Sequence, residues 1–151
     1  MGQFTLSAQF KCSPAALREY LGTVSNFPLI TDPELEIEII EAPELVTAGA
    51  EIEFSIMTSG LRQVLKHRWK TVSDSQIVAE QVTGPAQSWQ HAQTISATDE
   101  GCSLEETVTF EPPGGMLGFL VTEDAILKSL STGTAIRHQL IAEQLNTGQL
   151  T

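Results

Sequence analysis

Three side chains of this 151-residue chain combine acid, base and cation chemistry: Glu106, His91 and Arg137. Glu106 alternates with the apolar Leu104 and Val108, so on a strand it shares their inward face. A carboxylate among apolar side chains needs a cation or hydrogen bonds to remain charged. We expect either His91, on the neighbouring strand, or Arg137, on a C-terminal helix, to be its partner.

Two kinds of chemistry fit these residues. Glu106 and His91 are candidate catalytic residues that could act as acid and base on a ligand carbonyl or hydroxyl, or as its hydrogen-bond anchors. Arg137 could then bind an acidic ligand group. Alternatively, the same side chains form a satisfied polar cluster that holds a helix to a sheet, or Arg137 extends to the mouth of a cavity. The sequence leaves these alternatives open.

Other candidate site residues follow from strand and helix periodicity. Trp89, His91 and Gln93 are two apart and share one face of a strand, as do His67 and Trp69 on another. The full set of expected ligand-binding residues is Trp89, His91, Gln93, Glu106, Val108, Phe110, Leu127, Leu130, Thr134, Arg137, Phe54, His67 and Trp69.

Alternating patterns predict seven strands, over residues 3–12, 35–40, 51–56, 63–72, 77–83, 88–98 and 102–111. A short helix is expected over 14–21. Ser13 can cap its N-terminus, Pro14 suits the first helical position, and Gly22 can end it. The segment 26–33 carries two prolines and is expected to hold a turn or two of helix, in a lid-like connection.

The C-terminal segment 117–145 is predicted to form one long helix. Its apolar face comprises Phe119, Ile126, Leu127, Leu130, Leu140 and Ile141. Gly133 could make room there for a ligand or for a crossing strand, and a local bend is expected around it. The expected fold is α+β: a curved seven-stranded antiparallel sheet wrapped around this helix, with two short helices between the first two strands. One domain is expected over residues 1–151.

Composition and charge exclude several classes of protein. The hydrophobic content is 41% and the net charge is -11, from 19 acidic and 8 basic residues, which disfavours nucleic acid and anionic membranes as partners. No run approaches the length of a membrane span, and the first residues lack the features of a signal peptide. We therefore expect a cytoplasmic protein with no nucleic-acid partner and no stable membrane anchoring.

Cysteine and histidine patterns give little sign of metal chemistry. Cys12 and Cys102 are expected to be reduced core thiols without a disulfide. The three histidines have no spacing typical of metal ligands, so neither a metal nor another cofactor is expected.

A basic strand could suggest a nucleic-acid site. Lys66, Arg68 and Lys70 share one strand face, however, and pairing with Glu51 and Glu53 on the neighbouring strand accounts for them.

Several motifs resemble a known family. They are Glu80-Gln81-Val82-x-Gly84-Pro85, Trp89-x-His91, Pro112-x-Gly114 before Leu117-Gly118, and the pair Arg137-His138. Together they resemble the polyketide cyclase/dehydrase-like and coenzyme Q-binding branch of the SRPBCC (START-like) superfamily. The branch often has His and Phe where this chain has Gln93 and Ile95, and Asp where it has Glu106.

The resemblance implies a helix-grip fold whose first and last strands pair, which would make Cys12 and Cys102 neighbours. It also implies a hydrophobic cavity for a lipid, isoprenoid quinone or aromatic polyketide-like molecule. The expected function is binding or transport of such a molecule. The alternatives are a cyclase/dehydrase-type lyase using Glu106 and His91, and a protein-interaction module with a closed pocket. The oligomeric state stays open.

Overall fold

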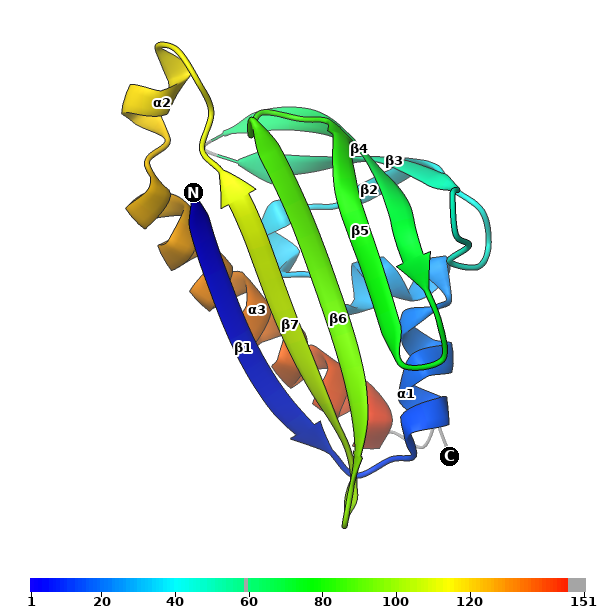
Figure 1. Ribbon diagram of the computed structural model, residues 1–151. Helices are drawn as coiled ribbons and strands as arrows, with labels where there is room; N and C mark the ends of the chain where they lie inside the picture. The colour runs from blue at the N-terminus through cyan, green and yellow to red at the C-terminus, as the bar shows by residue number, and fades with distance from the viewer. Residues whose placement is uncertain (59, 147–151) are drawn as a thin grey trace.

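The computed structural model describes residues 1–58 and 60–146 (Figure 1). In these residues seven strands, three α-helices and two 3-10 helices follow one another along the chain. The order is β1 (Gly2–Phe10), α1 (Pro14–Leu21), η1 (Val24–Ile30), η2 (Pro33–Leu35), β2 (Glu38–Glu41), β3 (Glu51–Thr58), β4 (Leu61–Val72), β5 (Gln76–Thr83), β6 (Ser88–Thr98), β7 (Gly101–Glu111), α2 (Leu117–Leu120) and α3 (Glu123–Asn146).

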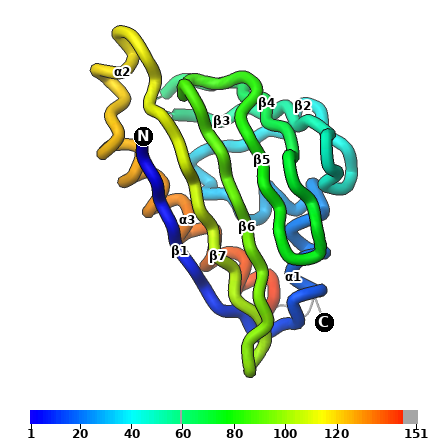
Figure 2. The backbone as a smooth tube through the Cα atoms, in the orientation of Figure 1, coloured from blue at the N-terminus to red at the C-terminus, as the bar shows by residue number. Residues whose placement is uncertain are grey.

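The strands form one antiparallel sheet in the order β1-β7-β6-β5-β4-β3-β2. Strand β1 therefore pairs with β7, the last strand of the chain, and not with β2, which follows it in the sequence. The register places Leu6 opposite Glu106. Helix α3 runs behind β1 and β7 on the inner side of the sheet (Figures 1 and 2). This architecture confirms the expected seven-stranded sheet around a C-terminal helix.

Local signals explain the short helices between β1 and β2. The Ser13 side chain accepts a hydrogen bond from the Ala16 amide at 3.1 Å, and α1 ends at Gly22. Residues 35–37 do not belong to β2, contrary to the prediction. The Asp32 carboxylate caps η2, and Glu36 then adopts a left-handed conformation at φ 43°, so pairing begins only at Glu38.

The predicted single helix over 117–145 is wrong, because the chain forms two helices there. The Thr122 hydroxyl accepts a hydrogen bond from the Ala125 amide at 3.2 Å and thereby starts α3, with Glu123 and Asp124 in its first turn. Phe119 in α2 is 85% exposed, so its predicted burial is also wrong.

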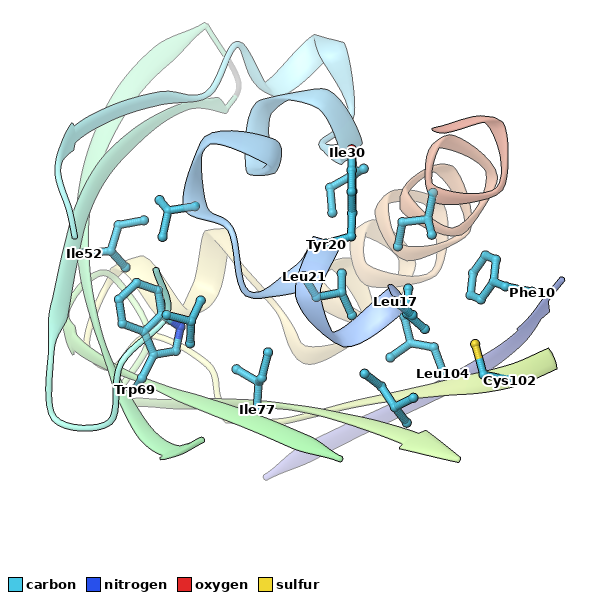
Figure 3. Packing of buried hydrophobic residues seen from close by; sticks show 14 residues of the cluster. Phe10, Leu17, Tyr20, Leu21, Ile30, Ile52, Trp69, Ile77, Cys102 and Leu104 are labelled. Carbon is cyan, nitrogen blue, oxygen red and sulfur yellow. The ribbon is translucent and has the colours of Figure 1, made fainter. Parts of the chain in front are cut away.

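The hydrophobic core lies between the sheet and helices α1 and η1, with the C-terminal part of α3 beside them (Figure 3). Leu17, Tyr20 and Leu21 of α1 belong to the same buried cluster as Trp69 and Ile77 of the sheet. Tyr20 lies beside Ile30 of η1 in Figure 3, and Leu17 lies near Leu104 of β7. Among the helices that the structure describes, none is long and apolar enough to cross a membrane.

Candidate functional site

Glu106 lies in the middle of β7, paired with β1 on one side and β6 on the other. It alternates with the buried Leu104 and Val108 on the inner face, and its side chain is 1% exposed. A carboxylate in such a position loses nearly all contact with water, so its stability depends on the donors around it.

Four side chains donate hydrogen bonds to this carboxylate. Oε1 accepts from His91 Nε2 at 2.8 Å and Gln93 Nε2 at 3.0 Å. Oε2 accepts from Arg137 Nε at 3.1 Å and His138 Nε2 at 2.6 Å. Because an ionised carboxylate only accepts, each histidine carries a proton on Nε2. We call these five residues the Glu106 network.

Strand register and helix contact bring these donors together. Gln93 lies directly opposite Glu106 on β6, and His91 comes two residues earlier on the same face. Arg137 and His138 are consecutive on α3 and reach the same oxygen. His91 and Arg137 were expected as alternatives, and the structure contains both contacts.

His138 was not predicted as a site residue. Its signal was present in the sequence, because it lies four residues after Thr134 and three before Ile141, and both of these are buried on α3. Its ring also packs edge-on against Phe10, with centroids 6.4 Å apart.

The network fixes the ionisation of Glu106. Burial alone would raise the pKa of this carboxyl, but the positive charge of Arg137 and hydrogen bonds from His138 and His91 lower it well below the usual value. Glu106 is therefore a carboxylate over the whole neutral range.

His67 on β4 extends the polar region toward β3. Burial, followed by repulsion from His91 when that ring is protonated, lowers the pKa of His67 to about 4, so the His67 ring is neutral at pH 7. The Phe54 ring packs perpendicular to it, with centroids 5.1 Å apart. Trp69, by contrast, lies in the core against Phe27, with centroids 6.5 Å apart.

The remaining predicted site residues fall into two groups. Val108, Phe110 and Thr134 are buried, and Trp89 packs on the Phe110 ring with centroids 5.7 Å apart. Leu127 and Leu130 on α3 are only half-buried, as are Phe54, His67 and Trp89 on the sheet.

Exposure differs sharply across the network. The side chains of Glu106 and His138 are 1% and 8% exposed, whereas His91 and Arg137 remain 21% and 24% exposed. One side of the network is therefore sealed by the core, and the other side is open to solvent or to a ligand.

Comparison with known proteins gives structural likeness without sequence similarity. No protein-family model matches the chain, and no curated protein sequence matches it. The di-domain ARO/CYC StfQ from the steffimycin biosynthetic pathway superposes with a TM-score of 0.75 at 16% identity, over 97% of this chain and 51% of StfQ. This chain thus spans about half the length of StfQ.

Two further solved structures cover nearly the full length of both chains. The major latex-like protein 151 from Panax ginseng matches with a TM-score of 0.69 at 13% identity, over 95% of this chain and 96% of its own. Ara h 8.0201 matches with a TM-score of 0.60 at 19% identity, over 93% and 98%. The chain has the helix-grip fold. The fold that the sequence motifs implied is thereby confirmed.

A pocket of about 350 Å³ opens at one end of the helix-grip sheet. Pairing of β5 with β6 stops at Glu80 and Gln90, although β5 continues to Thr83, so the two strands separate there. The pocket is lined by Glu80, Gln81, Gln87, Ser88, Trp89, Gln90 and Thr109. Trp89 shares the inner face with His91, whereas Gln90 and Thr109 point to the opposite face of the sheet. None of the lining residues belongs to α3 or to the Glu106 network, so this pocket lies apart from the network.

Within residues 1–58 and 60–146, no group of three or more His, Cys, Asp or Glu side chains is arranged to hold a metal ion. His91 and His138 both direct Nε2 at the Glu106 carboxylate. The chemistry that the arrangement offers is thus hydrogen bonding and proton exchange beside a partly apolar wall.

Proposed function

We propose that this helix-grip protein binds a hydrophobic small molecule between the sheet and α3, with His91 and Arg137 holding the polar end of that molecule. The observation that carries the proposal is the unequal exposure of the Glu106 network. His91 and Arg137 stay accessible on the inner side of the sheet, while Glu106, which orients both, is sealed.

The orientation of these two side chains leaves specific groups for a ligand. Arg137 contacts Glu106 through Nε, so its terminal amino groups can donate to a ligand oxygen. His91 donates through Nε2, so Nδ1 can accept a hydrogen bond from a ligand hydroxyl. A carbonyl, carboxylate or hydroxyl head group would satisfy them.

The body of the ligand would contact apolar side chains that the protein leaves half-buried. Phe54 and Trp89 on the sheet and Leu127 and Leu130 on α3 have this property. Such residues on inner faces are typical of a site that a ligand completes, because apolar side chains otherwise gain by full burial. A lipid, quinone or aromatic polyketide-like molecule fits this description.

A cyclase-type enzyme is the second candidate, favoured by the direct His91–Glu106 contact and by likeness to StfQ, an ARO/CYC protein. Glu106 itself is a poor general base, because its lowered pKa and four donors reduce its affinity for a proton. In this alternative His91 would be the base, through Nδ1, and Glu106 would be a positioning residue.

Native mass spectrometry of the purified protein, followed by organic extraction, tests for a bound apolar molecule. Titration with parinaric acid and with its methyl ester then tests the polar anchor, since the two probes differ only in the acidic head. We expect wild-type protein to bind both. We expect Arg137→Ala to weaken the acid by about tenfold, the equivalent of one charged hydrogen bond, with a smaller effect on the ester.

Lys128→Ala is the matched control, because it removes a cation from an exposed position of the same helix. Equal losses for the acid and the ester in Arg137→Ala would contradict the anchor. A protein that is purified empty and takes up neither probe would favour an interaction module with a closed pocket.

A further inference from the structure

The two cysteines of the chain meet across the sheet. Cys102, the second residue of β7, lies opposite Phe10, and Cys12 follows two residues after Phe10, just past the end of β1. Their sulfur atoms lie 3.7 Å apart, although 90 positions separate them in the sequence. The expected proximity of the two thiols is therefore confirmed, and both are free.

The close approach is built into the backbone. Gly101, the first residue of β7, lies so near the 10–12 segment that a Cβ atom there would be 2.9 Å from the Cys12 amide nitrogen and would collide with the Phe10 carbonyl oxygen. Only glycine permits this contact without displacement of the backbone. The pairing of the thiols is thus a consequence of how β1 ends against the β6–β7 turn (Figure 1).

The two thiols differ in access to solvent. Cys102 is 0% exposed and points into the core beside Phe10 (Figure 3), whereas Cys12 is partly exposed. A soluble oxidant therefore reaches Cys12, and Cys102 is shielded behind it. This is the arrangement of an attacking thiol with an adjacent resolving thiol.

We propose that Cys12 and Cys102 form a reversible disulfide when the protein meets a two-electron oxidant such as hydrogen peroxide. The Cys12 thiolate attacks one peroxide oxygen, the O–O bond breaks, and Cys12 becomes a sulfenic acid while hydroxide leaves and is protonated to water. The Cys102 sulfur then attacks the Cys12 sulfur, the S–O bond breaks, and the hydroxyl leaves with the Cys102 proton as a second water.

Geometry brings the two sulfur atoms within reach of each other. Burial and the contact with Cys12 raise the pKa of Cys102 to about 12, so Cys102 must transfer its proton to the leaving hydroxyl as the S–S bond forms. The sulfur atoms must approach from 3.7 Å to a bond of about 2.05 Å. Cys12 lies outside regular β1 and before α1, where its backbone is not held in the strand ladder.

Oxidation would tie the start of α1 to the final strand pair. The cross-link would lie two residues from Phe10, whose ring contacts His138 of the Glu106 network. It would close a loop of 90 residues, so the oxidised form should unfold at a higher temperature.

The test treats folded wild-type protein with hydrogen peroxide and measures intact mass, free thiols and melting temperature, before and after reduction. We expect loss of two hydrogen masses and of both thiols, with a raised melting temperature, all reversed by dithiothreitol. Cys12→Ala should retain its Cys102 thiol under the same treatment. Cys102→Ala should stop at a Cys12 sulfenic acid that dimedone traps.

Wild-type protein alone can overturn the proposal, whether or not the variants fold. Gain of oxygen mass at Cys12 while Cys102 stays a thiol would show that the pair does not close. If both thiols remain intact after treatment with peroxide and after treatment with the thiol oxidant diamide, the proposal is also overturned.

Discussion

Replacement of Glu106 by glutamine tests the physical basis of the site. The variant keeps the size of the side chain but changes one acceptor oxygen into a donor amide. Arg137 cannot accept a hydrogen bond, so the glutamine oxygen must face Arg137 and His138. Its amide then faces His91 and Gln93, which can adapt by a change of tautomer and by an amide flip.

The expected loss of stability follows from the charge that remains. Removal of one partner of a buried ion pair typically costs about 3–5 kcal/mol, because the other charge is left without compensation. Arg137 is 24% exposed, so water partly solvates it. We therefore expect Glu106→Gln to lower the free energy of unfolding by about 3 kcal/mol at pH 7, the lower end of that range.

The loss should depend on pH. The pKa of Glu106 is lowered in the folded state from its ordinary value of 4.5, so its contribution to stability is complete well above pH 4.5 and is lost as the pH falls toward the folded-state pKa. At about pH 3.5 the difference between variant and wild type should be smaller by about 1.4 kcal/mol.

Urea unfolding of the two proteins at both pH values measures these differences. Glu105→Gln is the matched control, because it removes the same charge from an exposed position next to Glu106 and should change stability by less than about 0.5 kcal/mol. The reasoning would be refuted if Glu106→Gln were as stable as the control, or if its deficit were the same at pH 7 and pH 3.5.

Three further predictions concern His67, Gly101 and Gly133. The pKa of His67 falls from 6.5 to about 4 on folding, so this residue should reduce stability as the pH drops from 6.5 to 4, by at most about 3 kcal/mol. His67→Phe should flatten that part of the pH–stability curve, and an unchanged slope would contradict the assignment. Gly101→Ala should lower the free energy of unfolding by about 1–3 kcal/mol, because its Cβ meets backbone atoms of the 10–12 segment. Gly133→Ala should instead raise it by about 1 kcal/mol, because a Cβ in the middle of α3 meets nothing within 4 Å. Chemical denaturation of the two glycine variants in parallel measures these changes. A change of the same sign in both free energies of unfolding would contradict the predictions.

Local patterns determined how much of the fold could be predicted. The strand at 88–98 was predicted with the bounds of β6 because its alternation is regular and turn residues flank it. The break before α3 was missed because Thr122 lies within a run of helix-compatible residues, and only its hydrogen bond reveals the cap. Phe119 was misplaced for the same reason.

The site was predicted in part, because it depends on contacts between distant segments. Alternation on β7 was enough to place Glu106 on the inner face among apolar residues. Two of the four donors, Arg137 and His138, depend on which turn of α3 lies over β7, and no local pattern gives that. The contact of His138 with Glu106 therefore became clear only from the arrangement of α3 against the sheet, and that of Gln93 from the register of β6 with β7.

The pairing of β1 with β7 has a consequence for synthesis on the ribosome. The first strand to be made is hydrogen-bonded in the sheet only to the last strand, about 100 residues later. Until β7 emerges, β1 is an unpaired strand with alternating apolar residues, which is a site for wrong pairing. Nascent chains truncated before residue 101 should therefore leave β1 sensitive to protease, and folding of the complete sheet should be slow compared with its local hairpins.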